Sequence, residues 1–139
     1  YGLLSHLLRD AWPDESMNIT SGDIDPRCEE FGWKLYHNSD INFVTEDMIS
    51  SDLHEYSAII STSCEHVEPD VLEKFIKSKS DDAWVVLQSN NFYELDSHIN
   101  CQDDVMQFAN WVEPHLNEKV YFAGTLNLGD FERYMVIGK

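Results

Sequence analysis

The chain has 139 residues, of which 42% are hydrophobic and 12% aromatic, so it carries enough apolar material for the core of one domain. It contains no apolar run long enough to cross a membrane. Its formal net charge is −17, from 26 acidic and nine basic side chains, and no basic stripe interrupts the acidity. We therefore expect neither a membrane nor a nucleic-acid partner, and we attribute the charge to solubility.

The three cysteines are widely spaced and form no C-x-x-C pair. Cys28, Cys64 and Cys101 are also odd in number, which argues against a disulfide framework. The opening residues lack the basic region of a signal peptide. These features predict a protein of the reducing cytoplasm.

The first half of the chain reads as helix, strand, helix, strand. Residues 2–11 place four leucines on one helical face, and residues 17–24 follow as a short strand. Asp25 is a plausible N-cap for a helix that begins at Pro26 and runs to about His37. We expect its apolar side to face the sheet through Cys28, Phe31, Leu35 and Trp33. Residues 41–45 form the next strand.

The second half continues the alternation and ends in two adjacent strands. Strands are expected over residues 57–63 and 83–88 and helices over 69–77 and 102–112, with a polar turn at 89–91. The run at 83–88 is nearly all apolar, which predicts burial on both faces. Residues 120–126 and 133–137 predict an antiparallel pair that contributes an edge strand.

This order predicts one Rossmann-like domain over residues 1–139. Alternation of this kind is typical of a mostly parallel sheet with helices on both faces, a three-layer α/β/α arrangement, here with a C-terminal antiparallel hairpin. We expect the four tryptophans to belong to the core rather than to stack on a cofactor, and Tyr1, Phe92 and Tyr93 to be better placed to line a pocket.

The stretch I-T-S-G-D-I-D-P, residues 19–26, is the most informative motif. It places Asp23 at the corner between a strand and a helix, about 20 residues after Gly2, where a nucleotide-binding βαβ unit holds the ribose hydroxyls. Asp23 could instead cap the helix, but Asp25 is better placed to do so. Asp23 is therefore a candidate cofactor ligand.

A second cluster, Cys64-Glu65-His66, follows the strand at 57–63. Groups at the carboxyl end of a central strand lie in the crevice where such sheets bind ligands, and a His or a desolvated Glu there could orient or deprotonate an acceptor. The alternative is that Glu65 and His66 merely begin the next helix. Asn90, Asn91 and His98 would shape the acceptor pocket, although asparagines are also common in turns.

A metal was considered and not assigned. Cys64, His66, His98 and Cys101 offer four N and S ligands, but their spacing is not a standard zinc motif. Cys64 is equally well explained as a small buried apolar side chain.

The order of elements and these motifs resemble the class I methyltransferases that use S-adenosylmethionine (SAM). The resemblance covers the chain except for the family's first strand and most of its glycine loop, of which Gly2 resembles the last glycine. It implies that Asp23 binds the ribose and that Ile24 lies beside the adenine. Glu46-Asp47-Met48 resembles the family's step after its third strand, where Asp47 and Met48 would serve the adenine, although Asp47 could simply cap a turn. Ser63 falls at the strand end that faces the cofactor.

The resemblance implies SAM-dependent methyl transfer to a small polar acceptor. Glu65 and His66 are the candidate catalytic residues. Two alternatives remain open: a binding module that has kept the fold without catalysis, and another nucleotide-dependent enzyme such as a dehydrogenase. The expected antiparallel last strand favours the methyltransferase over the dehydrogenase.

Overall fold

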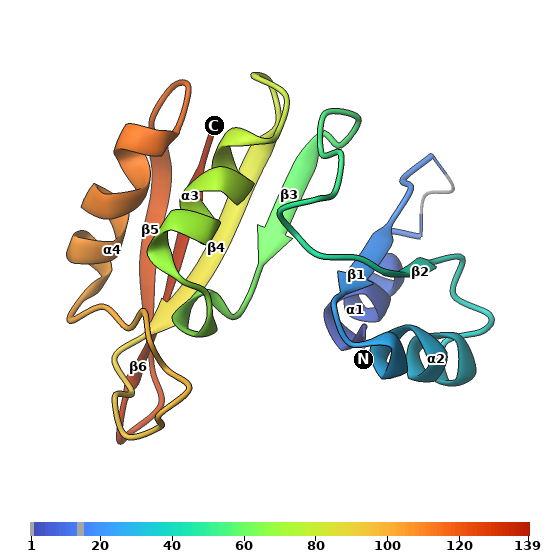
Figure 1. The fold of residues 1–139 in the computed structure, drawn as a ribbon, viewed down its shortest axis with the longest axis horizontal. Coiled ribbons are helices and arrows are strands. Elements are labelled where there is room, and N and C mark those ends of the chain that lie inside the picture. The colour runs from blue at the N-terminus through green and yellow to red at the C-terminus, as the bar shows by residue number, and fades with distance from the viewer. Residues whose placement is uncertain (1, 14–15) are drawn as a thin grey trace. The chain divides into compact units, whose positions relative to one another are not determined.

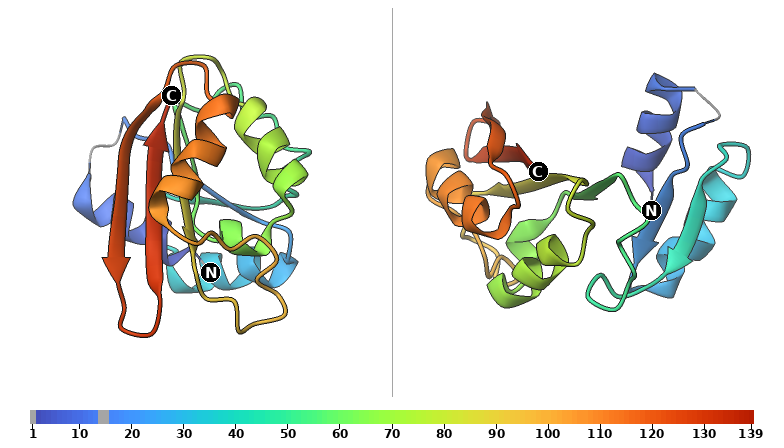
Figure 2. Two further views of the ribbon diagram at one scale, coloured as in Figure 1. Left: turned by 90° about the vertical axis from the view of Figure 1, so that its left-hand side faces the viewer. Right: turned by 90° about the horizontal axis from the view of Figure 1, so that it is seen from above.

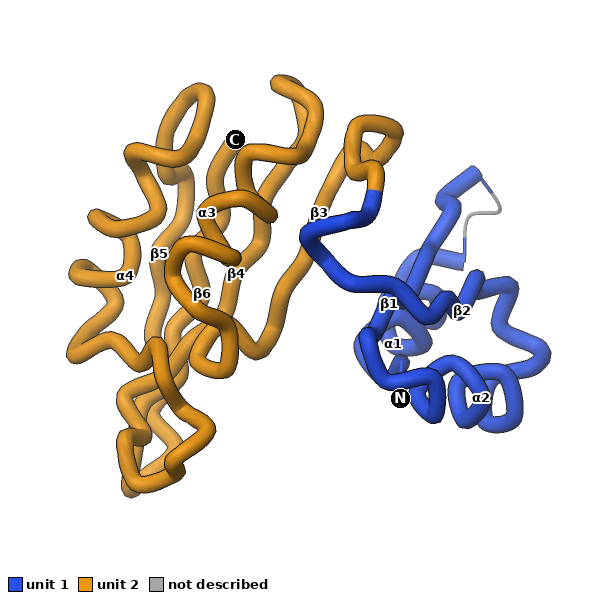
Figure 3. The backbone as a smooth tube through the Cα atoms, in the orientation of Figure 1, with its two compact units in different colours: residues 1–51 blue, residues 52–139 orange. Residues whose placement is uncertain are grey.

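A computed structural model describes residues 2–13 and 16–139, and the chain divides into two compact units. Unit 1 comprises residues 1–51 and unit 2 residues 52–139 (Figure 3). Both contain helices and strands, which confirms the α/β class. Tyr1, a candidate pocket residue, lies outside the described residues. In the described part of the chain, every helix is too short or too polar to cross a bilayer.

Unit 1 is a parallel strand pair connected through a helix. Its elements are α1 (Leu3–Ala11), β1 (Thr20–Asp23), α2 (Pro26–Leu35) and β2 (Asn42–Thr45). β1 and β2 are parallel, with Thr20 opposite Asn42 and Asp23 opposite Thr45. Helix α2 begins at Pro26 because the Asp25 carboxylate accepts a hydrogen bond of 2.9 Å from the Arg27 N–H, as the sequence predicted.

The Phe43 ring is the centre of unit 1, and two glycines make room for it. A Cβ atom on Gly2 or on Gly32 would lie only 2.4 Å from the ring. Gly2 also has φ = +77°, a conformation that favours glycine, at the start of α1. Backbone segments of α1 and α2 therefore touch a ring that is 3% exposed.

The expected sheet-facing side chains of α2 were wrong for Phe31 and Leu35, whereas Trp33 contacts the Phe43 ring of β2 edge-on. Phe31, Trp33 and Leu35 are 41%, 46% and 60% exposed, and Cys28 is half-buried. The only buried residue of the helix is Gly32, because Phe43 of the sheet reaches the α2 backbone there. Helix α2 therefore packs on the sheet through the contact of Gly32 with Phe43, and not through the row of apolar side chains that the sequence pattern indicated.

Unit 2 contains a four-stranded sheet in the order β3-β4-β6-β5 (Figure 1). Its elements are β3 (Ala58–Ser61), the 3₁₀ helix η1 (Cys64–His66), α3 (Pro69–Lys77), β4 (Trp84–Asn90), α4 (Val105–Val112), the 3₁₀ helix η2 (Glu113–His115), β5 (Val120–Asn127) and β6 (Glu132–Gly138). β3 and β4 are parallel, and β6 is antiparallel to both of its neighbours. Three of the four strands therefore run in one direction, which confirms the mainly parallel character.

The sequence predicted that the antiparallel strand would form the edge of the sheet. In the structure this strand, β6, lies inside the sheet. β6 inserts between β4 and β5, and β5 forms the edge. Burial explains the order: Tyr134 and Val136 of β6 are 0% and 1% exposed, whereas β5 has no buried residue. β6, which carries the two buried side chains, therefore occupies the interior position of the sheet, and β5 occupies the edge.

Helices α3 and α4 cover one face of this sheet (Figure 2). Side chains that are at most 1% exposed fill the space between them: Leu72, Ile76, Val85, Leu87, Phe108, Val112, Tyr134 and Val136. On the other face of β4, Trp84 is 40% exposed and Val86 and Gln88 are half-buried, so the expected burial of residues 83–88 on both faces was wrong. Ser89 and Asn90, expected in a turn, continue the strand.

The tryptophans were also misassigned to the core. Trp12, Trp33 and Trp84 are exposed by 40% or more, and Trp111 is half-buried. In unit 2 the buried aromatic positions are occupied instead by Phe75, Phe108 and Tyr134.

Candidate functional site

The carboxyl ends of β1 and β2 bring two of the predicted cofactor ligands to the same edge of unit 1. Asp23 ends β1 opposite Thr45, and the Glu46 N–H donates to the Asp23 carbonyl at 3.0 Å. Asp47 follows directly, so both carboxylates emerge where a parallel pair presents its ligand-binding edge.

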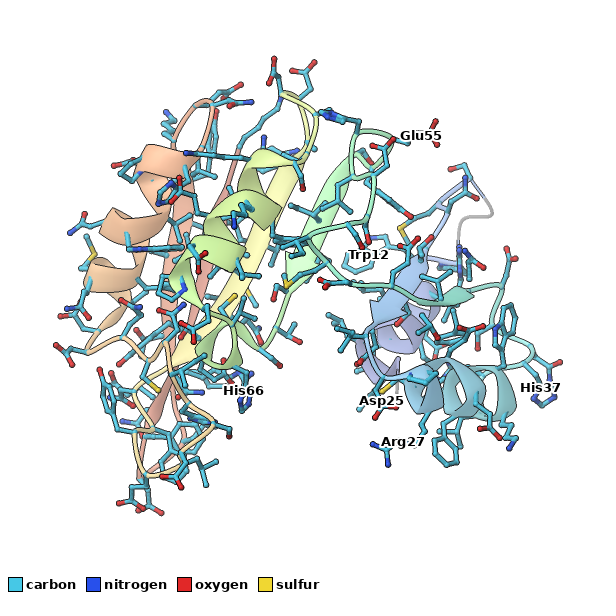
Figure 4. The ribbon with its side chains drawn as sticks, in the orientation of Figure 1. Trp12, Asp25, Arg27, His37, Glu55 and His66 are labelled. Carbon is cyan, nitrogen blue, oxygen red and sulfur yellow. The ribbon has the colours of Figure 1, made fainter. Side chains whose placement is uncertain are left out.

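Asp25 caps α2 as the sequence predicted, and ribose binding by Asp23 stays a prediction. Asp25 caps α2, and its hydrogen bonds from the Arg27 side chain and backbone lower its pKa to about 2. Figure 4 shows Asp25 and Arg27 together at the start of α2. Asp23 is exposed, and its carboxylate accepts from the Asp25 N–H at 2.9 Å and interacts with the Cys28 thiol, while Ile24 beside it is 69% exposed. An exposed acid with an exposed apolar neighbour suits a sugar next to a base.

Asp47 forms a turn. Its carboxylate accepts from the Ile49 N–H at 3.1 Å, and its carbonyl accepts from the Ser50 and Ser51 N–H groups. Met48 beside it is half-buried. The turn-capping interpretation therefore describes the geometry, and the adenine contacts of Asp47 and Met48 stay predictions. A cofactor-binding role of Gly2 also stays a prediction.

In unit 2, η1 turns Cys64 and Glu65 inward and leaves Ser63 and His66 exposed. Cys64 is fully buried with its thiol against Ser61, and burial raises its pKa to about 12. This confirms Cys64 as a small buried apolar group. Ser63 precedes η1 without capping it, and its cofactor contact stays a prediction.

Glu65 is a buried carboxylate, 3% exposed. Its Oε1 lies 3.7 Å from Nη2 of Arg133, whose guanidinium also donates to the Thr62 carbonyl. Its Oε2 is buried without a hydrogen-bond partner among the described residues. Arg133 was missed by sequence reasoning, because it is 68 positions from Glu65 and arrives on the inserted strand β6. The available signal was a basic residue at the start of the predicted strand 133–137.

His66 and His98 come together although 32 positions separate them in the sequence. Their ring centroids are 4.6 Å apart in an edge-to-face arrangement, and Figure 4 labels His66 on the segment after β3. His66 Nδ1 bonds to the Ser97 carbonyl at 3.0 Å, and His98 Nδ1 to the Phe92 carbonyl at 2.6 Å. The candidate catalytic and acceptor-binding residues thus meet within unit 2.

Asn90 and Asn91 hold the segment after β4 in shape. The Asn90 side-chain oxygen accepts from the Phe92 N–H at 2.9 Å and from the Cys101 thiol at 3.4 Å. The Asn91 oxygen accepts from the Glu132 N–H at 2.7 Å. Beside them lies a shallow hollow lined by Asn91, Phe92, Tyr93, Glu94 and Asp130. Acceptor binding by the two asparagines stays a prediction.

Comparisons with known proteins relate this geometry to a fold family. No protein-family model matches the chain, and a comparison with curated protein sequences found no match. Among solved structures, LepI in complex with SAM has a TM-score of 0.73 at 9% identity, over 99% of this chain and 40% of LepI. The methyltransferase CalH in complex with SAH gives 0.71 at 9% identity, over 98% and 47%. The chain therefore spans about two fifths of the length of LepI.

A third similar structure is magnesium protoporphyrin IX methyltransferase from Synechocystis PCC 6803 with bound SAH. Its TM-score is 0.70 at 11% identity, over 98% of this chain and 68% of that protein. At such low identity the comparisons concern the fold alone. They confirm it: the chain has the Rossmann-like fold of the class I methyltransferases.

Proposed function

We propose that this chain supplies the cofactor and acceptor sites of a SAM-dependent methyltransferase that acts on a small polar molecule. The observation that carries the proposal is the edge of unit 1, where the carboxylates of Asp23 and Asp47 follow neighbouring parallel strands. The fold shared with CalH and the protoporphyrin enzyme supports it.

Unit 1 would hold the nucleoside. The Asp23 carboxylate accepts hydrogen bonds from a vicinal diol, and Ile24 offers an apolar surface to the adjoining base. Asp47 and Met48 serve the base from the next strand end, and Gly2 lets the start of α1 approach the cofactor closely. When bound, SAM supplies an electrophilic methyl group on its sulfonium sulfur.

Unit 2 would hold and prepare the acceptor. Glu65 and His66 orient the acceptor or take up its proton, and His98, Asn90 and Asn91 shape its pocket. Most of the protein's contribution is alignment of the acceptor with the methyl carbon for in-line displacement. The acidity of the chain argues for a small-molecule acceptor and against nucleic acid. Three free thiols favour the cytoplasm.

Titration calorimetry with S-adenosylhomocysteine tests the cofactor assignment. We expect saturable binding that Asp23→Asn weakens by about 10- to 100-fold, roughly 1–3 kcal/mol, because the variant loses charge-assisted hydrogen bonds to the ribose. Asp10→Asn is the matched control, since Asp10 is an exposed acid on α1 of the same unit.

Equal affinities for the wild type and the Asp23→Asn variant would contradict the ribose assignment. Failure of the wild type to bind in this chain and in a version extended before Tyr1 would favour a binding module without catalysis.

A further inference from the structure

Three metal-ligating side chains form a cluster, two from η1 and one from the segment before α4. A carboxylate oxygen of Glu65 and one ring nitrogen each of His66 and His98 all lie within 4.8 Å of one another. Two imidazoles and a carboxylate are a ligand set of mononuclear zinc sites and of other first-row divalent metals. We propose that Glu65, His66 and His98 bind one divalent transition-metal ion, represented by Zn²⁺.

The hydrogen bonds of the two histidines prepare them as ligands. In each ring Nδ1 bonds to a backbone carbonyl, that of Ser97 for His66 and that of Phe92 for His98. A carbonyl oxygen only accepts, so Nδ1 carries the proton and the lone pair of the neutral ring is on Nε2. Metal-binding histidines characteristically donate their other N–H in this way.

Glu65 supplies the negative charge. Burying a carboxylate oxygen without a partner is costly, yet Oε2 of Glu65 is buried and no described residue bonds to it. Arg133 lies 3.7 Å from the other oxygen, Oε1. A cation beside Oε2 would satisfy the one polar atom that the surrounding residues leave without a partner.

Buried hydrogen bonds hold the two segments of the cluster together. Asn100 is 7% exposed; its N–H donates to the Glu65 carbonyl at 3.0 Å, and its side-chain amide donates to the Cys64 carbonyl at 3.3 Å. Gln102 in turn donates to the Asn100 side-chain oxygen at 3.1 Å. The backbone that carries Glu65 is therefore fixed relative to the backbone beside His98, as a preorganised site requires.

Metal binding needs a small contraction. Tetrahedral ligands at bonds of about 2.1 Å lie about 3.4 Å apart, so the rings must rotate inward from the present spacing. His66 is exposed and His98 half-buried, which leaves both rings space to rotate and the ion a path from solvent. Three protein ligands leave a fourth position for water or for an acceptor oxygen. The cluster differs from the four residues weighed in the sequence: it contains Glu65 and neither cysteine, and the Cys64 thiol is buried toward Ser61.

The metal ligands are residues that we also assign to the acceptor site, so a role of the ion in methyl transfer rests on the proposed function. A hydroxyl bound to a divalent ion loses its proton at lower pH, so the ion would take the place of an imidazole base in preparing the acceptor.

The test is titration of Zn²⁺ into the untagged, EDTA-treated 139-residue chain, followed by calorimetry. We expect one equivalent to bind. His66→Gln and His98→Gln should each weaken binding by more than about 100-fold, beyond the 10- to 100-fold typical of groups that only orient a ligand. Glu65→Gln keeps the shape and removes the charge, and it should also weaken binding. His37→Gln and His54→Gln, at exposed histidines away from the cluster, are matched controls with unchanged affinity.

Absence of saturable binding, or equal affinity in the His66, His98 and control variants, would overturn the proposal. Circular dichroism establishes that each variant is folded. If a variant does not fold, the visible absorption spectrum of the Co²⁺-loaded wild type tests the metal site instead. A spectrum identical to that of aqueous Co²⁺ would contradict coordination by the protein. Zn²⁺ binding without S-adenosylhomocysteine binding would support the metal site and contradict the methyltransferase proposal. Binding of S-adenosylhomocysteine without Zn²⁺ binding would contradict the metal site and support the methyltransferase proposal.

Discussion

Two acids two positions apart, Asp23 and Asp25, have different surroundings in unit 1. Asp25 is tied to Arg27 through backbone and side chain, so its carboxylate is engaged as a helix cap. Asp23 precedes it at the strand end, where its carboxylate accepts from the Asp25 N–H and interacts with the Cys28 thiol. The capping preference of Asp before Pro is local, which is why the sequence predicted the Asp25 cap correctly.

Cys64 and Glu65 are adjacent buried groups whose environments differ. The thiol is a fully buried neutral group, whereas the carboxylate is opposite Arg133. The two residues are adjacent in the sequence, and their different partners are decided by the direction of each side chain.

The raised pKa of Cys64 predicts lower stability in alkali. The unfolded thiol ionises near its ordinary pKa of 9.0, while the folded one stays protonated until about 12. Stability is therefore retained below pH 9 and falls as the pH rises through this interval, by about 1 kcal/mol at pH 10. Urea unfolding at pH 8 and pH 10 measures the loss. Cys64→Ala should reduce the difference, whereas the half-buried Cys28→Ala should reduce it less; identical pH dependence in all three proteins would contradict the assignment.

Helix α2 illustrates how one glycine can position an element. Gly32 contacts the Phe43 ring, and that ring also lies edge-on to Trp33 at 5.5 Å between centroids. The helical pattern of Phe31 and Leu35 predicted a different face, because periodicity cannot report where a neighbouring strand places a large ring.

Gly32→Ala should destabilise unit 1. The new Cβ would lie 2.4 Å from Phe43 Cδ1, which forces the ring or the helix to move. Overpacking of this kind costs roughly 1–3 kcal/mol, offset by up to about 1 kcal/mol from the better helix propensity of alanine. Urea unfolding followed by Trp fluorescence measures the difference.

Gly22→Ala is the control, since its Cβ would meet only Val44 at 3.6 Å, an ordinary contact. Combining Gly32→Ala with Phe43→Leu should recover part of the loss. A Gly32→Ala protein as stable as the wild type would show that the ring adapts without cost.

For the whole molecule, charge is the dominant property. A net −17 on 139 residues means that folded protein repels itself, and the repulsion is screened within about 10 Å at 0.1 M salt. The same excess of acid weakens any attraction to a phosphate backbone.

We expect thermal stability to rise with ionic strength. Moving from about 0.01 M to 0.15 M monovalent salt shortens the screening length from about 30 Å to 8 Å. An increase of about 1 kcal/mol in the free energy of unfolding would raise the Tm by roughly 3 °C. Differential scanning fluorimetry in NaCl and in choline chloride measures the shift, and similar rises in both salts identify screening rather than specific Na⁺ binding. A Tm that does not change with either salt would contradict the prediction.

The sequence by itself determined the local features: the alternation of helices and strands, the Asp25 cap at Pro26, the strand-end position of Asp23 and the fold class. These follow from periodicity, propensity and capping, which act over a few residues. Only the tertiary structure decided the insertion of β6 between its neighbours and the exposure of the tryptophans. It also decided the packing of Phe43 against Gly32 and the contacts of Glu65 with Arg133 and of His66 with His98. Those outcomes depend on which distant segments pack together, and no local pattern encodes the contact between residues 65 and 133.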